Sequence, residues 1–253
     1  MKTVAVPLVA LVALGLAGCG SSSSSSSSSK PAAHGSAGAS SAPAAAPSLN
    51  GEQSKTPQQV LADAKSALFN AQAVHVKGTM SQQGRSETLD MQFQGEDTAG
   101  SVTTSGITLD IVKTAGKVYV KAPEQFWAKT AGPAAAPKLA NRWLVQDAAM
   151  AGNVSTLTLQ GVAASLNAAG SPLKPDVASI QVAGQPAVVV TEQDGSTLAV
   201  ATTGAPLPLK VTGNGAAKGS LTFTDYGKKQ PITAPPGAVS PQQAAKAPTT
   251  GSA

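Results

Sequence analysis

The sequence has little of what most metal-binding, disulfide-bonded and membrane-spanning proteins depend on. Its 253 residues include one cysteine, two histidines, 3% aromatic residues and 12% charged residues. A lone cysteine excludes an internal disulfide framework. The apolar runs are also too short to span a bilayer as a helix, which takes about 20 residues. The folded part must therefore be stabilised by packing and hydrogen bonds.

Motifs for catalysis are missing as well. No HExxH motif, cysteine cluster or phosphate-binding glycine loop is present. A serine nucleophile needs a base within reach, yet His34 falls in a low-complexity stretch, and the strand pattern turns His75 toward solvent. Asp90 and Asp110 occupy outward strand positions and could face each other, but exposed carboxylates more often form a solvated surface than an acid–base pair. We expect no enzyme, no metal and no cofactor.

The charge pattern argues against nucleic-acid binding. The formal charge is +5, but the lysines and arginines are scattered and few aromatic residues lie among them. With 42% hydrophobic residues the chain is not a highly charged disordered protein. About 180 residues remain after the flexible ends are removed, enough for one domain with a sizeable core. We expect one folded domain and a monomer.

A targeting signal opens the chain. Lys2 precedes an apolar run, residues 3–16, and Leu16-Ala17-Gly18-Cys19 follows the pattern of a bacterial lipoprotein box. A plain signal peptide that happens to contain a cysteine is the alternative. The lipoprotein interpretation is favoured because Cys19 is the only cysteine and a polar serine run follows it. We therefore predict a signal peptide over 1–18, lipid attachment at Cys19, and anchoring at the extracytoplasmic face of the cell membrane.

Composition then divides the rest of the chain. Residues 19–53 are rich in Ser, Ala, Pro and Gly, which cannot bury enough apolar surface to offset the entropy of ordering. We predict a disordered tether there, a folded domain over 54–237, and a disordered tail over 238–253.

Periodicity predicts the elements of the domain. Thr56, Pro57 and Gln59 form a helix-start signature, and the apolar residues that follow recur at helical spacing to about Asn70. Short alternating segments, typical of half-buried strands, follow at 74–80, 88–94, 101–105, 107–111 and 117–121. Glycines near the joins favour tight turns between consecutive antiparallel strands.

The second half of the domain is also predicted to contain a helix followed by strands. Residues 123–153 contain both tryptophans and are interpreted as a covering loop with short helical turns, and a second helix is expected from Thr158. Five more strands are predicted at 177–182, 187–192, 197–202, 207–212 and 220–226, with Asp194-Gly195 as a hairpin signal. The residues thus indicate a long antiparallel sheet with one apolar face, which helices or a ligand must cover.

Several segments resemble a known family, and they occur in the same order behind the lipoprotein box. They are residues 116–121, the region around Trp127 and 141–143, and residues 184–188, 207–209 and 232–236. They are similar to the actinobacterial lipoproteins of the LppX and LprG group, which share a fold with the lipoprotein carrier LolA. The resemblance implies an α+β fold in which helices cover the concave face of a strongly bent antiparallel half-barrel. It also implies a lipid or lipoglycan ligand held in an apolar cavity.

Two functions stay open at this point. If the chain binds or carries a lipid, the apolar row of the sheet and the first helix supply the cavity, and ordinary core packing is the alternative for each position. The cavity candidates are Leu61, Leu68, Val76, Leu89, Met91, Leu109, Ile111, Val118 and Val120. In the second hypothesis a tethered, non-catalytic envelope module binds a protein or glycan, with Trp127 and Trp143 as anchors unless they pack against the sheet.

Overall fold

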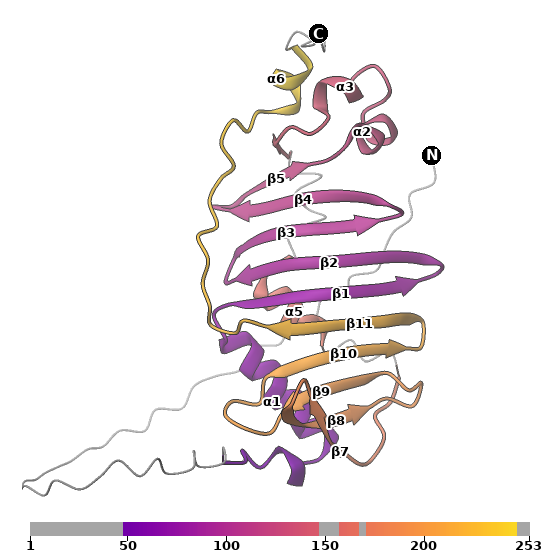
Figure 1. The fold of residues 1–253 in the computed structure, drawn as a ribbon, viewed down its shortest axis with the longest axis vertical. Helices are drawn as coiled ribbons and strands as arrows, with labels where there is room; N and C mark the ends of the chain where they lie inside the picture. Colours follow the sequence, from indigo (N-terminus) through magenta and orange to yellow (C-terminus); the bar gives the residue numbers. More distant parts are fainter. Residues whose placement is uncertain (1–47, 147–156, 167–170, 247–253) are drawn as a thin grey trace, which may run out of the picture. The chain divides into compact units, whose positions relative to one another are not determined.

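The domain is built on one curved, open antiparallel sheet. The computed structural model describes residues 48–146, 157–166 and 171–246, all within the second of the two units (1–44 and 45–253) into which the chain divides. The strand order is β6-β5-β4-β3-β2-β1-β11-β10-β9-β8-β7 (Figure 1). The strands are β1 (Val74–Gln82), β2 (Arg85–Gln94), β3 (Asp97–Thr104), β4 (Ile107–Thr114), β5 (Lys117–Lys121), β6 (Leu144–Val145), β7 (Ala178–Val182), β8 (Gln185–Thr191), β9 (Thr197–Ala201), β10 (Pro208–Asn214) and β11 (Ala217–Thr224).

Two meanders meet in the middle of this sheet. Strands β1–β5 pair with their neighbours in sequence, as do β7–β11, and each predicted strand is confirmed with bounds shifted by a few residues. The two halves join where β1 pairs with β11, from His75 opposite Thr224 to Gln82 opposite Ala217. Local periodicity gives no signal for this long-range pairing.

Helix α1 (Pro57–Asn70) begins as predicted. The Thr56 hydroxyl accepts a hydrogen bond from the Gln59 backbone N–H, and the Gln59 side chain accepts one from the Thr56 N–H, which completes a capping box. Val60, Ala64 and Leu68 form its buried stripe. Two of them, Val60 and Ala64, pack with side chains of β8 and β9.

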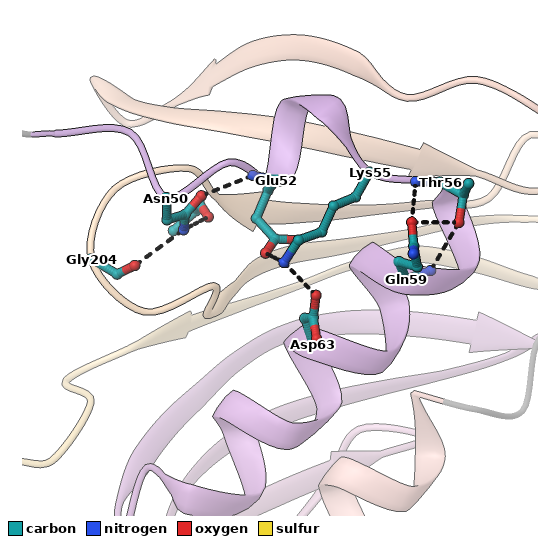
Figure 2. A network of polar contacts seen from close by, with 8 residues as sticks. Asn50, Glu52, Lys55, Thr56, Gln59, Asp63 and Gly204 are labelled. Atoms are coloured by element: carbon teal, nitrogen blue, oxygen red, sulfur yellow. Dashed lines mark hydrogen bonds and ion pairs between the residues drawn. The ribbon is translucent and has the colours of Figure 1, made fainter.

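A polar network fixes the chain just before this helix (Figure 2). The Asn50 amide donates to the carbonyls of Ala201 (3.0 Å) and Gly204 (3.1 Å), next to β9. Lys55 Nζ then bridges the buried Glu52 carboxylate at 2.7 Å and Asp63 of α1 at 2.6 Å. Because Asp63 lies on α1, these contacts fix the helix relative to the end of β9 and the β9–β10 connection.

Helix α5 (Leu159–Ser165) lies on the same face of the sheet as α1. Its N-cap, Thr158, accepts a hydrogen bond from Gly161 N–H at 2.9 Å, as the sequence predicts. The Thr98 hydroxyl donates to the Leu157 carbonyl at 2.7 Å, and Leu159 N–H donates to the Gly95 carbonyl at 3.2 Å. The β2–β3 hairpin therefore positions the start of this helix over the concave face.

The short helices α2 (Glu124–Thr130), α3 (Ala136–Leu139) and α6 (Pro241–Lys246) lie at the β5–β6 end of the sheet (Figure 1). Residues 225–240, here called the C-terminal strap, run from β11 along the strand ends to α6. The Gln94 side chain exchanges hydrogen bonds with the backbone of Gln230, and Val239 pairs with Leu144 of β6.

The ordered region extends beyond the expected 54–237. Asn50 N–H donates to the Thr202 carbonyl at 2.7 Å before residue 54, and Leu49 bridges Thr203. After residue 237, α6 buries Ala244 against the core that includes Leu139 of α3. These residues lie in the segments predicted as tether and tail, because compositional bias hides a few packed residues at each boundary.

One side chain departs from the predicted alternation. Alternation along β2 would turn Gln92 toward solvent, since its neighbours Met91 and Phe93 form the apolar side of the strand, but Gln92 is only 7% exposed. Its amide donates to the Lys228 carbonyl at 3.2 Å. Lys228 belongs to the C-terminal strap, and a contact with so distant a segment leaves no trace in the local pattern.

Candidate functional site

A cavity of about 580 Å³ lies between the concave face of the sheet and the helices α1 and α5. Strands β1, β2 and β8–β11 form its floor, and α1 and α5 form its walls. Its apolar lining consists of Leu61, Val76, Met80, Leu89, Phe93, Leu157, Val162, Leu166, Leu173, Val190, Leu198, Val211, Leu221 and Phe223. The remaining lining residues are polar or small and are concentrated at one end.

Strand register explains why this part of the face is apolar. Residues directly opposite each other on paired strands share a face of the sheet. One row of such residues crosses six strands. The row is Leu89, Gly78, Leu221, Val211, Leu198 and Val190. The second residue of this row, Gly78, has φ +155°, and a methyl group there would collide with the Ser220 carbonyl. The row therefore has a gap where it crosses β1, which helps to leave space above the sheet.

The helices close the cavity from the other side. Leu61 enters from α1, and Val162 and Leu166 enter from α5 or its C-cap. The segment before β7 adds Leu173, whose backbone bridges Glu192. The walls are thus held by the capping box of α1, the N-cap of α5 and the hydrogen bonds that place the two helices.

Three of the predicted cavity residues, Leu61, Val76 and Leu89, lie on the cavity lining. The other six do not. Leu68, Met91, Ile111, Val118 and Val120 are buried in the main core, and Leu109 is half-buried against it. All six lie on the apolar side of their elements, but in the part of the domain that side chains fill.

The sequence prediction missed the lining residues of β8–β11. Alternation places Leu221 and Phe223 on one face of β11, and helical spacing places Val162 and Leu166 on one side of α5, but these local patterns do not show that the four residues line a cavity. The signal that could have found them is the pairing of β11 with β1, which places Leu221 opposite Gly78.

One end of the cavity is lined by polar and small residues and is here called the cavity mouth. Its residues are Gln82, Ser165, Ser171, Glu192, Asp194, Ser196, Thr197, Thr212, Gly213, Gly215, Ala216 and Ala217. The β8–β9 turn and the β10–β11 turn meet here. Asn214 N–H donates to the Ser196 hydroxyl at 3.1 Å, and the Asn214 amide donates to the Asp194 carbonyl at 3.2 Å. The mouth is therefore a defined structure rather than two independent turns.

A second hollow, of about 540 Å³, lies beside the C-terminal half of α1 and is more open to solvent. Asp63, Asn70 and Pro206 are among the residues around it, with Tyr226 at its base. Burial raises the pKa of the Tyr226 phenol well above its ordinary value, and its hydroxyl donates to the Pro208 carbonyl. This hydrogen bond ties the start of the C-terminal strap to β10.

The convex face carries an ionic cluster around His75. His75 Nε2 lies 2.6 Å from Asp90 Oδ1, and its Nδ1 lies 3.7 Å from Asp225 Oδ2. Lys77 binds the same Asp90 at 2.7 Å, and hydrogen bonds from Lys77 and then His75 hold the pKa of the Asp90 carboxyl below its usual range. Lys228 pairs with Asp225 at 2.7 Å and is the main cause of the lowered pKa of Asp225.

This cluster corrects two predictions. His75 is not simply solvated, since each ring nitrogen faces a carboxylate, which leaves neither nitrogen directed at a serine or threonine hydroxyl. Asp90 and Asp110 also do not face each other. Both are opposite Ser101 of β3, so one strand separates them, which places their backbones about 10 Å apart.

The two tryptophans differ in environment. Trp127 is 3% exposed, donates its indole N–H to the Ala122 carbonyl at 3.2 Å, and packs edge-to-face on Phe126. Trp143 is half-buried, with Lys121 Nζ 5.9 Å from its ring centroid. Packing against the sheet therefore accounts for Trp127, and the interpretation of Trp127 as an exposed anchor is wrong.

The described residues contain neither a cluster of metal ligands nor a membrane-spanning helix. Across 48–146, 157–166 and 171–246, no three His, Cys, Asp or Glu side chains gather closely enough to hold a metal ion. None of the helices in these ranges is both long and apolar enough to cross a bilayer. Cys19, the predicted lipid-attachment residue, and His34 lie outside the described residues.

Comparison with solved structures finds matches of low sequence identity. LprF from Mycobacterium bovis is 13% identical, with a TM-score of 0.49, and the match covers 71% of this chain and 96% of LprF. The Mycobacterium tuberculosis lipoprotein LppX is 13% identical, with a TM-score of 0.46 and coverage of 70% and 99%. MucB, solved in complex with MucA(peri), is 13% identical, with a TM-score of 0.33 and coverage of 71% and 60%.

No protein-family model matches the chain, and no curated protein sequence matches it. LprF and LppX are members of the group that the sequence motifs resemble. The chain thus resembles the LppX and LprG group of lipoproteins in its motifs, and its own domain has an α+β fold.

Proposed function

We propose that this protein is a cell-envelope lipoprotein that binds or carries a lipid or lipoglycan, whose acyl part occupies the cavity. The observation that carries the proposal is the apolar cavity of about 580 Å³ on the concave face. This volume falls within the range of about 300–1,000 Å³ typical of small-molecule sites, and an apolar lining with polar groups at one end is typical of them too. The family resemblance supports the same ligand class.

Burial of a hydrocarbon chain supplies the affinity. Each methylene group moved from water into an apolar site gains about 0.8 kcal/mol, so about twelve methylene groups gain on the order of 10 kcal/mol. The cost of immobilising the ligand reduces this gain. Since the lining is contributed by rigid strands and capped helices, little additional energy is spent on ordering the protein.

Anchoring through Cys19 completes the proposal. One acyl chain gives only marginal membrane attachment, whereas two or more chains give stable attachment. The protein would then take up or deliver its ligand close to the extracytoplasmic face of the membrane. Cys19→Ala is expected to leave the domain folded and to move it from the membrane fraction to the soluble fraction. Retention of this variant in the membrane fraction would contradict the anchor.

A non-catalytic role is part of the same proposal. It is supported by the pairing of His75 with Asp90 on the convex face, away from the cavity, and by the strand that separates Asp90 from Asp110. For the alternative role as a protein- or glycan-binding module, the buried position of Trp127 removes one of its two expected anchors.

Native mass spectrometry with organic extraction tests the proposal. The protein from residue 20 onward retains every described residue and can be exported without the lipid anchor in a related host. A bound species that extracts as a lipid is the expected result. If the protein emerges with its bare mass, and takes up neither added phospholipid nor added glycolipid, it is not a lipid-binding protein.

A further inference from the structure

The charge of the cavity mouth has one sign. Among the described lining residues, the ionisable side chains are Glu192 and Asp194, and there is no Lys, Arg or His. Both are half-buried, so solvent screens them less than it screens fully exposed charges. A ligand whose acyl part lies on the apolar lining and whose head group lies at the polar mouth therefore has that head group beside two carboxylates.

Each carboxylate is held by protein donors through one oxygen. Glu192 Oε2 accepts hydrogen bonds from the backbone N–H of Ser171 at 3.2 Å and from its hydroxyl at 3.4 Å. Asp194 Oδ1 accepts one from Ser196 N–H at 2.8 Å. No hydrogen bond from the described residues ends on Glu192 Oε1 or Asp194 Oδ2. Each carboxylate on the lining thus keeps one oxygen to which no described residue donates a hydrogen bond.

The neighbouring turn makes room for one of these oxygens. A side chain at position 215 would collide with Asp194 Oδ2, so the carboxylate can occupy this position only because residue 215 is glycine. Asn214 holds the same two turns together through its bonds to Asp194 and Ser196. The position of Asp194 is therefore determined by two strand connections.

Charged residues outside the lining also lie near the mouth. Arg85 is directly opposite Gln82, and Glu87 is directly opposite Met80, so the register places this pair of opposite charges on the concave side of β2. Lys174 and Lys218 follow the lining residues Leu173 and Ala217 in sequence, and both lysines are exposed to solvent. Solvent screens these exposed charges more than it screens the half-buried Glu192 and Asp194, which are the charged residues on the described lining itself.

We infer that the mouth selects lipids whose head groups donate hydroxyl hydrogen bonds and carry no net negative charge. A neutral glycosylated lipid fits this description, whereas an anionic phospholipid would place its phosphate beside two carboxylates without a cation in the lining. The inference rests on the proposed lipid-binding function and specifies its ligand class. Glu192 and Asp194 are its specificity-determining residues.

Lipid uptake from vesicles tests this selection. The protein from residue 20 onward is incubated with phosphatidylcholine vesicles that contain equal small fractions of monogalactosyl diacylglycerol and phosphatidylglycerol. It is then re-isolated and its bound lipids are counted by native mass spectrometry. We expect the galactolipid to exceed phosphatidylglycerol by about tenfold, which corresponds to a modest electrostatic penalty. Raising the salt concentration should reduce this preference, because salt screens the repulsion.

The double variant Glu192→Gln, Asp194→Asn removes both charges and keeps the shape of the side chains. It should raise the phosphatidylglycerol share at least about fivefold. The matched control Asp110→Asn removes a carboxylate that alternates with the buried Ile111 and so faces the convex side. It should leave the ratio unchanged.

The outcomes separate the inference from the proposed function. If the wild-type protein takes up both lipids equally at low salt, or if neither salt nor the double variant changes the ratio, the selection is refuted while lipid binding stands. If no lipid is taken up, both are refuted. The salt series needs no substitution, so it decides the question even where the double variant fails to fold.

Discussion

Filling the cavity should block ligand binding without unfolding the domain, and Val211→Trp is the substitution best placed to do so. Val211 is half-buried in β10, near the centre of the opposed row between Leu221 and Leu198. Tryptophan adds about seven heavy atoms, enough to displace about three methylene groups of an acyl chain. At about 0.8 kcal/mol each, the loss is about 2.4 kcal/mol, or about a 50-fold weaker Kd.

The assay is a fluorescence titration with a diacylglycerol that carries a labelled acyl chain, together with a thermal melt of each variant. Val189→Trp is the matched control, because Val189 alternates with the buried, cavity-lining Val190 and lies on the other face of β8. The control should bind like the wild type. A Val211→Trp variant that keeps its melting temperature and binds the ligand with unchanged Kd would show that the acyl chain does not occupy this cavity.

Three further changes test the fold. Thr56→Ala removes the capping box of α1 and should cost about 1 kcal/mol, which lowers the Tm by about 2–4 °C in a domain of this size. Gly78→Ala places a methyl group against the Ser220 carbonyl and should cost about 1–3 kcal/mol, seen as a lower urea midpoint; an unchanged midpoint would mean that β1 can shift at no cost. Asp90→Asn tests pH dependence. Because folding lowers the pKa of Asp90 below its ordinary 3.8, its carboxylate stabilises the fold above about pH 4, and this contribution is lost as the pH falls through the folded-state pKa. The stability difference between wild type and Asp90→Asn should therefore be present at about pH 6 and shrink by about pH 3, and a constant difference would contradict the ion-pair explanation.

Local signals in the sequence predicted the elements well. Thr56, Gln59 and Thr158 cap helices where expected, and Asp194-Gly195 lies between two paired strands. These features depend on residues a few positions apart, so their physics is present in any short window. The same is true of the alternation that separates Met91 from Asp90 across the sheet.

What could not be predicted depends on contacts between distant segments. Gln92 follows the alternation that would expose it, yet the C-terminal strap, more than a hundred residues later, covers it. The pairing of β1 with β11 joins two meanders that are each locally consistent on their own. The same limitation applies to the six predicted cavity residues that lie in the core. Periodicity identifies the apolar face of a strand but not what packs on that face.

The distribution of large side chains explains why one part of the face is filled and the other is open. Above β3–β6 the space is occupied by Trp127, Leu139 and Leu144, supported by α2 and α3. Phe93 and Phe223 belong both to that core and to the cavity lining, so they mark its boundary. On the β8–β11 side of these two rings, much of the cavity floor consists of Val, Leu and Gly residues. They are too small to fill all the space below α1 and α5. The low aromatic content of the chain therefore has a structural consequence: its few large rings fill one half of a continuous apolar face, and the other half keeps a volume that a flexible hydrocarbon chain can occupy.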